Sequence, residues 1–317
     1  MAETIVSMAN IPFFNKDDLE IMAKQTGETI HAFNRPDEAG EILPGADIVI
    51  TMGRLNKDTL QTCRSLKWLF SLSAGVDMLP LAELAARGVI VTNTRGVHGP
   101  QIAEQTMGMV IAFSRCLSLC YRNQLDRKWE RLPLSELTGK TLCIIGAGSI
   151  GREIARKAKA FDMRVIGLKR REELLEHFDE VWSIGKLPEA LQQADYTVLI
   201  TPLTEDTYHL IGPAEFRAMK RSSIFINVSR GDTVDETALI EALQNGSIAG
   251  AGLDVFHREP LPPDNPLWAM ENVIITPHDA GLSPNFITRV IDLFVVSLSC
   301  YRQGKPLPNQ VDLNRRY

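Results

Sequence analysis

Short apolar runs rich in Val and Ile alternate along this chain with longer stretches in which apolar residues recur at helical spacing. A strand buried on both faces of a sheet reads as an unbroken apolar run, and neighbouring parallel strands are joined by a helical crossover. The alternation therefore predicts an α/β fold with parallel sheets covered by helices on both faces. The strands expected on this ground are 47–52, 67–72, 89–93, 141–145, 164–168, 196–200, 223–228 and 272–276.

At 317 residues the chain is long enough for two domains. We expect a Rossmann-type, doubly wound dinucleotide-binding domain over 99–289, and a smaller, flavodoxin-like α/β substrate domain made of 1–98 and 290–317. The smaller domain is then discontinuous in sequence. A helical stretch at about 101–122 is expected to bridge the two, and an amphipathic segment at about 284–302 to return the chain to the first domain, with hinges near 98–102 and Ser283.

The net charge indicates which class of partner the protein binds, and the cysteines indicate its compartment. With 34 Lys and Arg against 39 Asp and Glu, the net charge is −5, so no general positive field attracts nucleic acid or an anionic membrane, and a small-molecule partner is expected. Nowhere do about 18 apolar residues run together, and no secretion signal opens the chain. Five scattered cysteines without a CxxC pair predict reduced thiols, no metal site and a cytoplasmic protein.

A GxGxxG motif follows the expected strand at 141–145 and opens a helical stretch. In that context the first glycine allows a tight turn, the second lets a pyrophosphate approach the backbone, and the third lets helix and strand pack closely. The helix N-terminus would then face the phosphates. The alternative is an ordinary glycine turn. The residues predicted to contact a dinucleotide are Gly146, Gly148, Ser149, Ile150 and Gly151.

The next expected strand indicates which dinucleotide is bound. An NAD site usually carries Asp or Glu about 20 residues after the glycines. Here the strand runs instead into Lys169, Arg170 and Arg171, cations that suit the 2′-phosphate of NADP. We therefore predict NADP, with NAD still possible. The alternative is that these cations are the solvated start of a helix over 171–178, neutralised by Glu172 and Glu173.

Further motifs lie at SAGVD (73–77), AEQT (103–106), TPLTEDT (201–207), NVSRGD (227–232), HREPLP (257–262) and ITPH (275–278). With GAGSIG they occur in the order typical of the D-isomer-specific 2-hydroxyacid dehydrogenases, a family that includes hydroxypyruvate and glyoxylate reductases. From about Ser73 to Asp312 the chain resembles that family, whereas about the first 60 residues match it weakly. The resemblance implies interconversion of a 2-oxo acid and a D-2-hydroxy acid with a nicotinamide cofactor.

That chemistry needs a cation to bind the carboxylate and a proton donor for the ketone oxygen. Arg230 follows an expected strand, and its guanidinium fork matches a carboxylate. His278 follows another strand and is of the type that titrates near neutral pH. Glu259, outside any helix because Pro260 follows it, is expected to raise the histidine pKa and orient its ring. The alternatives are a surface turn arginine and a structural histidine.

The resemblance assigns these three residues the same catalytic roles and adds others. Backbone N–H groups of Ala74, Gly75 and Val76 are implied to bind the substrate carboxylate. Of the other five histidines, His31, His177, His209 and His257 are expected to be surface or packing residues, and His98 a pocket-wall residue. Further cofactor contacts are implied at Thr201, Pro202, Thr207, Val228, Ser229, Asp254 and Gly281.

We therefore expect an oxidoreductase that transfers a hydride between NADP(H) and a small D-2-hydroxy acid or 2-oxo acid. Glyoxylate, hydroxypyruvate and larger 2-oxo acids remain open, because residues 52–54, His98 and Trp268 carry no readable specificity code. The resemblance also implies a homodimer formed through the helix after Gly99. The alternative is a non-catalytic dinucleotide sensor or corepressor on the same fold, against which the complete Arg230, Glu259 and His278 set argues.

Overall fold

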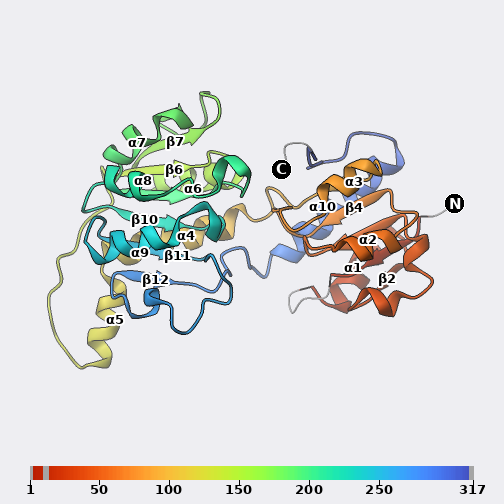
Figure 1. The fold of residues 1–317 in the computed structure, drawn as a ribbon, viewed down its shortest axis with the longest axis horizontal. Coiled ribbons are helices and arrows are strands. Elements are labelled where there is room, and N and C mark those ends of the chain that lie inside the picture. The colour runs from red at the N-terminus through yellow and green to blue at the C-terminus, as the bar shows by residue number, and fades with distance from the viewer. Residues whose placement is uncertain (1–2, 10–13, 314–317) are drawn as a thin grey trace. The chain divides into compact units, whose positions relative to one another are not determined.

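The computed structural model describes residues 3–9 and 14–313 and divides the chain into two units (Figure 1). The first contains residues up to His98 and from Ser283 onward, and the second is Gly99–Leu282. The predicted return to the first domain at residue 290 falls inside helix α10 (Phe286–Arg302). That helix belongs to the first unit as a whole because its apolar face, with Phe286, Val290 and Phe294, lies in that unit's core.

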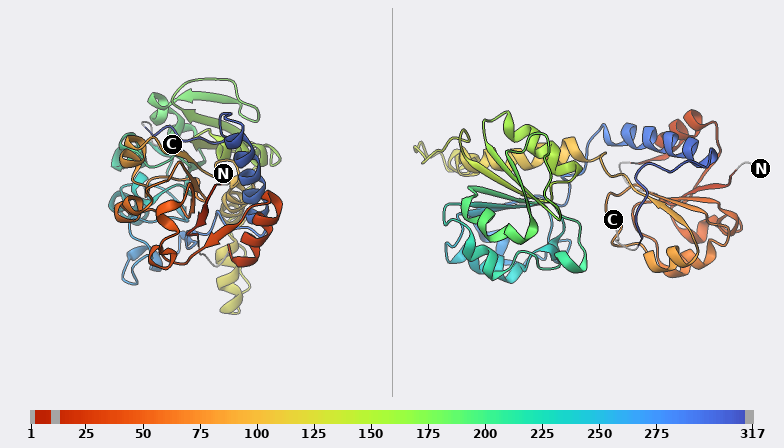
Figure 2. Two further views of the ribbon diagram at one scale, coloured as in Figure 1. Left: turned by 90° about the vertical axis from the view of Figure 1, so that its right-hand side faces the viewer. Right: turned by 90° about the horizontal axis from the view of Figure 1, so that it is seen from above.

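The described part of the first unit holds a parallel sheet in the order β2-β1-β3-β4-β5, the order of a flavodoxin-like fold. Alternate residues of each strand face opposite cores. Ile48 and Ile50 pack on the side of α1 and α10, which lie next to each other, whereas Val49 packs on the side of α2 and α3 (Figure 2). The elements are β1 (Ile5–Ser7), α1 (Lys16–Thr26), β2 (Ile30–Ala32), β3 (Ile48–Thr51), α2 (Lys57–Thr62), β4 (Trp68–Ser71), α3 (Leu81–Ala86) and β5 (Ile90–Thr92), with short 3₁₀ turns at Pro36–Ala39 and Leu43–Gly45.

The second unit, all of which is described, is a seven-stranded parallel sheet in the order β12-β11-β10-β9-β6-β7-β8. This is the Rossmann order with one added strand, and the order reverses between β6 and β9, where open α/β sheets bind ligands. Helices α4 and α6 cover one face, and α7, α8 and α9 the other.

The strands of this unit are β6 (Thr141–Ile145), β7 (Arg164–Lys169), β8 (Glu180–Ser183), β9 (Tyr196–Leu199), β10 (Ile224–Asn227), β11 (Gly250–Leu253) and β12 (Val273–Ile275). Its helices are α4 (Gly99–Ser114), α5 (Leu117–Leu125), α6 (Ser149–Lys159), α7 (Leu187–Gln193), α8 (Pro213–Ala218) and α9 (Glu236–Gln244). Short 3₁₀ turns occur at η3 (Ile184–Lys186), η4 (Glu205–Thr207), η5 (Gly231–Thr233) and η6 (Pro266–Ala269). The predicted fold class, a Rossmann-type sheet with a second α/β domain, is confirmed.

The single long helix expected at about 101–122 is wrong. It breaks into α4 and α5 because Cys116 adopts a left-handed conformation with φ of 51°. The backbone N–H of Ser135, 21 residues beyond Ser114, donates to the Ser114 carbonyl at 2.9 Å and so satisfies an end of α4. Helix α4 packs on α6 within the second unit.

The helix over 171–178, which belonged to the alternative interpretation of the cations, is absent from the described structure, where these residues form a loop leading to β8. Asp179 bonds the end of this loop to β7. Its N–H donates to the Val165 carbonyl, and its carboxylate accepts from the Val165 N–H at 2.7 Å. The Phe178 ring lies against Gly167, so closely that a Cβ there would be 2.6 Å from the ring. The segment also lacks an apolar helix face, since Leu174 is fully exposed.

Among the described residues, no helix combines the length and the hydropathy needed to cross a bilayer. The same part of the chain holds no group of three His, Cys, Asp or Glu side chains placed to bind a metal ion. All five cysteines are free thiols. Burial raises the pKa of Cys143 to about 12, so this thiol is a core residue and not a nucleophile.

Candidate active site

Three side chains singled out in the sequence lie beyond the carboxyl ends of three neighbouring strands. Arg230 follows β10, Glu259 lies in the loop after β11, and His278 follows β12. The three strands are adjacent in the sheet and parallel, so their carboxyl ends meet at one edge. Open α/β sheets bind ligands at this edge.

Glu259 and His278 form a hydrogen-bonded pair. Nδ1 of His278 donates to Oε2 of Glu259 at 2.7 Å, and Oε1 of Glu259 accepts from the Phe256 N–H at 3.1 Å. Partial burial acts to raise the pKa of Glu259, but these two hydrogen bonds and the positive charges of His278 and Arg230 outweigh it and hold that pKa below its usual value. The structure thus brings the predicted trio into one electrostatic cluster, with Nδ1 of the imidazole committed to the carboxylate.

A buried aspartate holds the turn that carries His278, which has a φ of 55°. The Asp254 carboxylate accepts from the Thr276 hydroxyl at 2.5 Å and from the backbone N–H groups of Asp279 and Ala280 at 3.2 Å. Asp254 is 2% exposed, and burial raises its pKa despite these bonds. Asp254, predicted as a cofactor contact, therefore also fixes the position of the histidine. The carbonyl of Gly281 accepts from Nε2 of Gln101, which ties the end of the turn to α4.

Hydroxyl and amide groups hold the backbone at Arg230. Its carbonyl accepts from Oγ1 of Thr233 at 2.6 Å and from Nδ2 of Asn227 at 3.1 Å. The buried Ser229 hydroxyl links the same two side chains, at 2.8 Å from Oδ1 of Asn227 and 2.9 Å from Oγ1 of Thr233. Nη1 of Arg230 donates to the Ser229 carbonyl, and Val228 is buried beside them. The guanidinium therefore projects from a closed polar turn.

The glycine motif connects β6 to α6 and has the geometry of a phosphate cradle. Gly146 has a φ of 114°, and a Cβ there would lie 2.6 Å from the Ile200 carbonyl oxygen, while one on Gly151 would lie 2.3 Å from the Gly146 oxygen. A Cβ on Gly148 would meet nothing within 4 Å. No side chain of the described residues caps α6, so the N–H groups of Ser149 and Ile150 face outward without an intrahelical partner.

The loop after β9 lies next to the glycines. The Thr201 hydroxyl is buried and has no hydrogen-bond partner within the described part of the chain, as expected where a ligand supplies one. The Thr207 hydroxyl donates to the Pro202 carbonyl at 2.6 Å and closes this loop on itself. The cradle and the unpartnered hydroxyl fit a dinucleotide with its phosphates over α6.

The predicted 2′-phosphate cations end β7, and acidic side chains lie among them. Lys169 pairs with Glu173, and Arg170 lies 3.5 Å from Asp206. Glu172 pairs with Lys186 instead. Arg171 is exposed. Glu173 thus balances part of the cationic charge, so the geometry alone leaves the choice between NADP and NAD open.

The substrate-binding loop expected at Ala74, Gly75 and Val76 belongs to the first unit and follows β4. Nδ2 of Asn93 donates to the Ala74 carbonyl at 2.7 Å. Val76 is 3% exposed and packs in the core, so only its backbone can face a ligand. His98 closes the same unit, with Nδ1 3.3 Å from the Thr94 carbonyl oxygen and its ring against Phe286.

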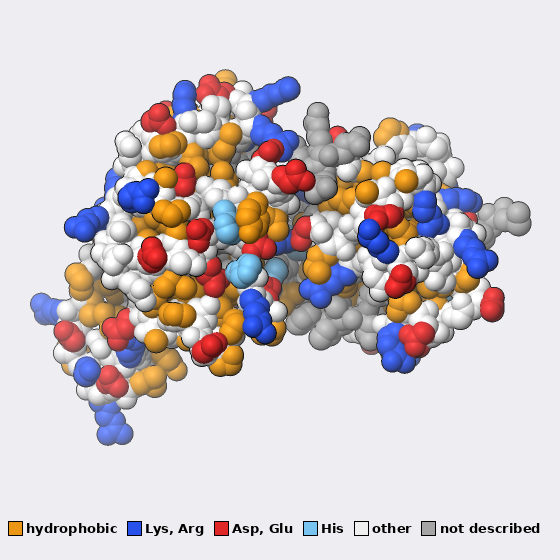
Figure 3. All heavy atoms as spheres, viewed as in Figure 1, with side chains coloured by type: hydrophobic (Ala, Val, Ile, Leu, Met, Phe, Trp, Pro, Cys, Tyr) orange, Lys and Arg blue, Asp and Glu red, His pale blue; other side chains and the backbone are white. Residues whose placement is uncertain are grey.

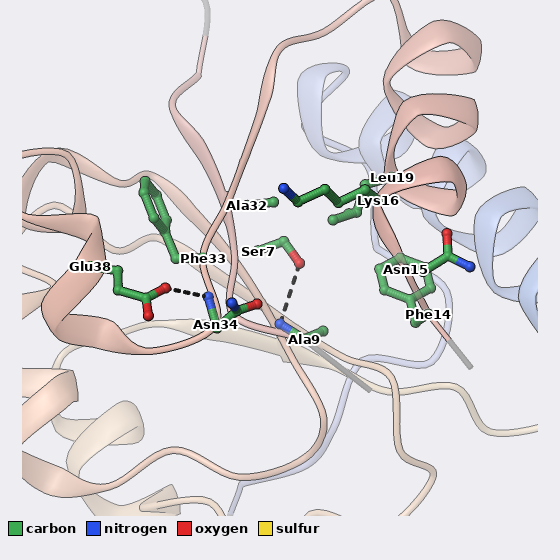
Figure 4. Close-up of a pocket in the computed structure, with 10 residues that line it drawn as sticks. All are labelled: Ser7, Ala9, Phe14, Asn15, Lys16, Leu19, Ala32, Phe33, Asn34 and Glu38. Atoms are coloured by element: carbon green, nitrogen blue, oxygen red, sulfur yellow. Dashed lines mark hydrogen bonds between the residues drawn. The ribbon is translucent and has the colours of Figure 1, made fainter. Parts of the chain in front are cut away.

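A cavity in the first unit lies at the ends of β1 and β2, beside the start of α1 (Figure 4). Ser7, Lys16, Asn34 and Glu38 are among the polar residues that line it, and the Asn34 N–H donates to Glu38 at 3.0 Å. Among the described lining residues there is none that the sequence predicts for the site.

The structure adds residues that the sequence did not suggest. His257, interpreted above as a surface or packing residue, contacts Asp232 through Nδ1 at 2.5 Å. These two residues are 25 positions apart in the chain and follow different strands. Neither lies in a sequence pattern that indicates the other. Gln101, Asn227 and Thr233, which fix the turns at Gly281 and Arg230, carry no sequence signal beyond their place after or before a predicted element.

Comparison with known proteins agrees with this arrangement. Residues 107–280 match the family model described as D-isomer specific 2-hydroxyacid dehydrogenase, NAD binding domain. A glyoxylate reductase of Korarchaeum cryptofilum is 36% identical over 81% of this chain and 80% of its own. The crystal structure of a D-isomer specific 2-hydroxyacid dehydrogenase family protein from Aeromonas salmonicida superposes with a TM-score of 0.89 at 33% identity, covering 99% of this chain and 100% of that one.

A third relative was crystallised with its cofactor. It is an NADPH-dependent glyoxylate/hydroxypyruvate reductase from Sinorhizobium meliloti in complex with NADP and sulfate, 26% identical, with a TM-score of 0.85 over 100% of both chains. A doubly wound sheet with this glycine loop and an acid–base pair at one edge defines a nicotinamide-dependent oxidoreductase. The chain belongs to the D-isomer specific 2-hydroxyacid dehydrogenase family.

Proposed function

We propose that the protein reduces a small 2-oxo acid to the D-2-hydroxy acid with NADPH, and that Arg230, Glu259 and His278 are its catalytic residues. The observation that carries the proposal is the cluster they form: a hydrogen-bonded imidazole and carboxylate, with a guanidinium whose charge acts on the same carboxylate. A 2-oxo acid presents a carboxylate and a ketone oxygen, which match a cation and a proton donor.

When bound, the nicotinamide supplies a hydride to the carbonyl carbon. Arg230 binds the substrate carboxylate through its planar fork and polarises the neighbouring ketone. His278 donates a proton to the ketone oxygen from Nε2, because Nδ1 already donates to Glu259. Glu259 stabilises the imidazolium before transfer and fixes the ring plane. In the oxidative direction the same nitrogen accepts the proton.

For the cofactor we propose NADP. Lys169, Arg170 and Arg171 stand where an NAD enzyme usually carries an acidic residue, and the Sinorhizobium relative binds NADP. The 2′-phosphate would replace Glu173 as the partner of Lys169. The glycine loop, Thr201, Pro202, Thr207, Val228, Ser229, Asp254 and Gly281 would contact the rest of the nucleotide.

For the substrate we propose glyoxylate or hydroxypyruvate, bound in part by the backbone of Ala74, Gly75 and Val76. The support comes from relatives that bear these names. The test is NADPH oxidation measured against a panel of glyoxylate, hydroxypyruvate and branched or aromatic 2-oxo acids. Turnover of a small 2-oxo acid is expected. Tight NADPH binding with no turnover across the panel would contradict the proposal and favour a dinucleotide sensor.

We further propose a homodimer that uses α5 and the loop after it. This segment exposes several large apolar side chains that the second unit does not cover, among them Leu117, Tyr121, Leu125 and Trp129 (Figure 3). A monomer seldom exposes so much apolar surface in one place. Size-exclusion chromatography with light scattering should give twice the chain's mass of 35.3 kDa. A monomer at micromolar concentration would contradict the dimer.

A further inference from the structure

We propose that Asp232 and His257 are positioning residues that hold Arg230 at the correct place relative to Glu259. The inference rests on the proposed function, in which Arg230 binds the substrate carboxylate. Arg230 and Asp232 belong to the turn after β10, and His257 and Glu259 to the loop after β11. The two catalytic side chains therefore sit two residues from the two members of a second charged pair.

The contact between the two segments is built from three links. Nδ1 of His257 donates to Oδ1 of Asp232 at 2.5 Å. The backbone N–H of His257 donates to Oε2 of Glu236, at the start of α9, at 3.0 Å. Between them, Gly231 lies so close to Phe256 that a Cβ would be 2.0 Å from its carbonyl carbon. Two acidic residues that follow Gly231 thus bind His257, Asp232 at its ring and Glu236 at its backbone.

Glu236 is itself fixed by a further bond. Its Oε1 accepts from Nδ2 of Asn265 at 2.9 Å, so the carboxylate is oriented before it receives the His257 N–H. The backbone of Asp232 is held as well, because its carbonyl accepts from the His209 N–H at 2.8 Å. The Asp232–His257 pair therefore joins two anchored backbones and does not merely connect two mobile side chains.

The Asp232–His257 pair should contribute little to the free energy of folding and more to the placement of Arg230. The side chains of His257 and Asp232 are 64% and 33% exposed, and ion pairs this open to water contribute little to folding. The distance between a guanidinium and a proton donor, in contrast, affects the rate steeply, because a misplacement of about 1 Å can cost about 100-fold. Loss of the pair should therefore reduce catalysis while leaving the fold intact.

The charge state of His257 gives the inference a distinctive pH dependence. The hydrogen bond to Asp232, and then the charges of Asp232 and Glu236, raise the pKa of His257. The other charged groups of the two segments are Arg230, Asp235, Asp254, Arg258, Glu259 and Asp264, and His209 is a further titratable residue whose backbone contacts the pair. With a raised pKa, the full ion pair is present below the ordinary histidine pKa of about 6.5 and weakens as pH rises through the higher folded value. The contribution of the Asp232–His257 ion pair to activity should therefore be largest at low pH and decrease as pH rises.

The experiment compares wild type, His257→Ala and His257→Asn, whose amide can donate from nearly the position of Nδ1 without titrating. Thermal unfolding, the NADPH dissociation constant, and kcat and KM for glyoxylate are measured from about pH 6 to 9. His177→Ala is the control, since His177 is another histidine of the second unit with an acidic neighbour, Glu176.

For His257→Ala we expect kcat/KM to fall about tenfold near pH 6, mainly through a higher KM, with unchanged melting temperature and NADPH affinity. The deficit should shrink as pH rises, because the His257 charge that the alanine variant lacks is then lost from wild type as well. Near pH 6, His257→Asn, which keeps the hydrogen bond to Asp232 but not the charge, should recover part of the loss, and His177→Ala should match wild type. A full rate in His257→Ala, or a deficit that is independent of pH and not rescued by Asn, would overturn the inference. Absence of turnover in wild type would instead overturn the proposed function.

Discussion

Oε2 of Glu259 lies 2.7 Å from Nδ1 of His278, so one nitrogen of the imidazole is committed to the carboxylate and Nε2 is the nitrogen that can face a substrate. If His278 is the proton donor, His278→Ala should lower kcat for 2-oxo acid reduction by about 10²- to 10⁴-fold, the usual contribution of general acid catalysis. NADPH affinity, measured by fluorescence titration, should stay close to wild type.

Glu259→Gln provides the companion measurement. Glutamine can still accept from the Phe256 N–H but carries no charge to stabilise an imidazolium. The pKa of Glu259 lies below its usual value of 4.5, so the carboxylate is charged at neutral pH and loses its charge only as pH falls through that lowered pKa. We expect Glu259→Gln to move the pH–rate profile to lower pH. An unchanged profile would show that the carboxylate does not tune the histidine.

Arg230→Lys tests whether the guanidinium fork is needed as well as the charge. Lysine keeps the positive charge but offers a single point of contact, so one charged hydrogen bond to the substrate carboxylate is lost. We expect kcat/KM to fall about 10- to 100-fold, the cost of such a bond. Arg258→Lys, at the exposed residue between His257 and Glu259, serves as the control and should have no effect. Equal rates in both variants would remove Arg230 from the site.

Substitution of two glycines of the nucleotide loop should affect two different properties, cofactor affinity at Gly148 and stability at Gly151. A Cβ on Gly148 meets nothing within 4 Å, so Gly148→Ala should unfold at the wild-type temperature and yet bind NADPH more weakly, because the methyl group occupies the phosphate cradle. A Cβ on Gly151 meets the Gly146 oxygen at 2.3 Å, so Gly151→Ala should lose about 1–3 kcal/mol of stability. Differential scanning calorimetry measures the change in stability, and isothermal titration calorimetry measures the change in NADPH affinity. Full affinity in Gly148→Ala would place the phosphates elsewhere.

The cofactor proposal predicts a reversal of preference. Lys169→Asp combined with Arg170→Gln should favour NADH, because the new carboxylate can bind the ribose hydroxyls and repels a 2′-phosphate. Glu173→Gln should act in the other direction and tighten NADPH, since Lys169 loses its competing partner. The ratio of kcat/KM for the two cofactors is the measurement. A wild-type enzyme that already prefers NADH would refute the proposal.

Asp254 predicts a stability effect that depends on pH. Burial raises the pKa of Asp254 in the folded state above the ordinary value of 3.8. The free energy of unfolding therefore falls as pH rises from that ordinary value to the raised one. Asparagine can keep the bonds at Oδ1 without a charge. The melting temperature of Asp254→Asn relative to wild type should therefore be higher at pH 7 than at pH 4. Asp254→Ala should lose about 1–3 kcal/mol through unpartnered N–H groups. A difference between Asn and wild type that is constant with pH would contradict the assignment.

The sequence was informative for most of the strands that bury both faces. Thr141–Ile145 is an unbroken apolar run, so its strand and the glycine loop after it were predictable. The strands β1, β2, β8 and β11 were not among those expected. β1 and β2 are short, the more exposed residues of β2 and β8 blur the pattern, and glycines interrupt the apolar run of β11. The placement of Arg230 and His278 at one edge followed from the rule that parallel strands end together, whereas Glu259 was expected there through its pairing with the histidine.

Contacts between loops could not be predicted in this way. The break between α4 and α5 occurs at Cys116 without glycine or proline, and depends on Ser135 reaching back to Ser114. The pairing of Asp232 with His257 depends on two loops approaching through Gly231 and Phe256, which no periodicity encodes. Such contacts arise from tertiary structure, and the residues that make them look ordinary in the chain.

The discontinuity of the first unit has a consequence for synthesis on the ribosome. Gly99–Leu282 is a single stretch, so it can finish folding as soon as it emerges. The earlier-made sheet of the first unit must wait, because Val290, Phe294 and Leu298, which complete its core, are translated afterwards. The half of the enzyme that is made first is thus the half that matures last, and it carries an open apolar face for as long as the other half takes to be made.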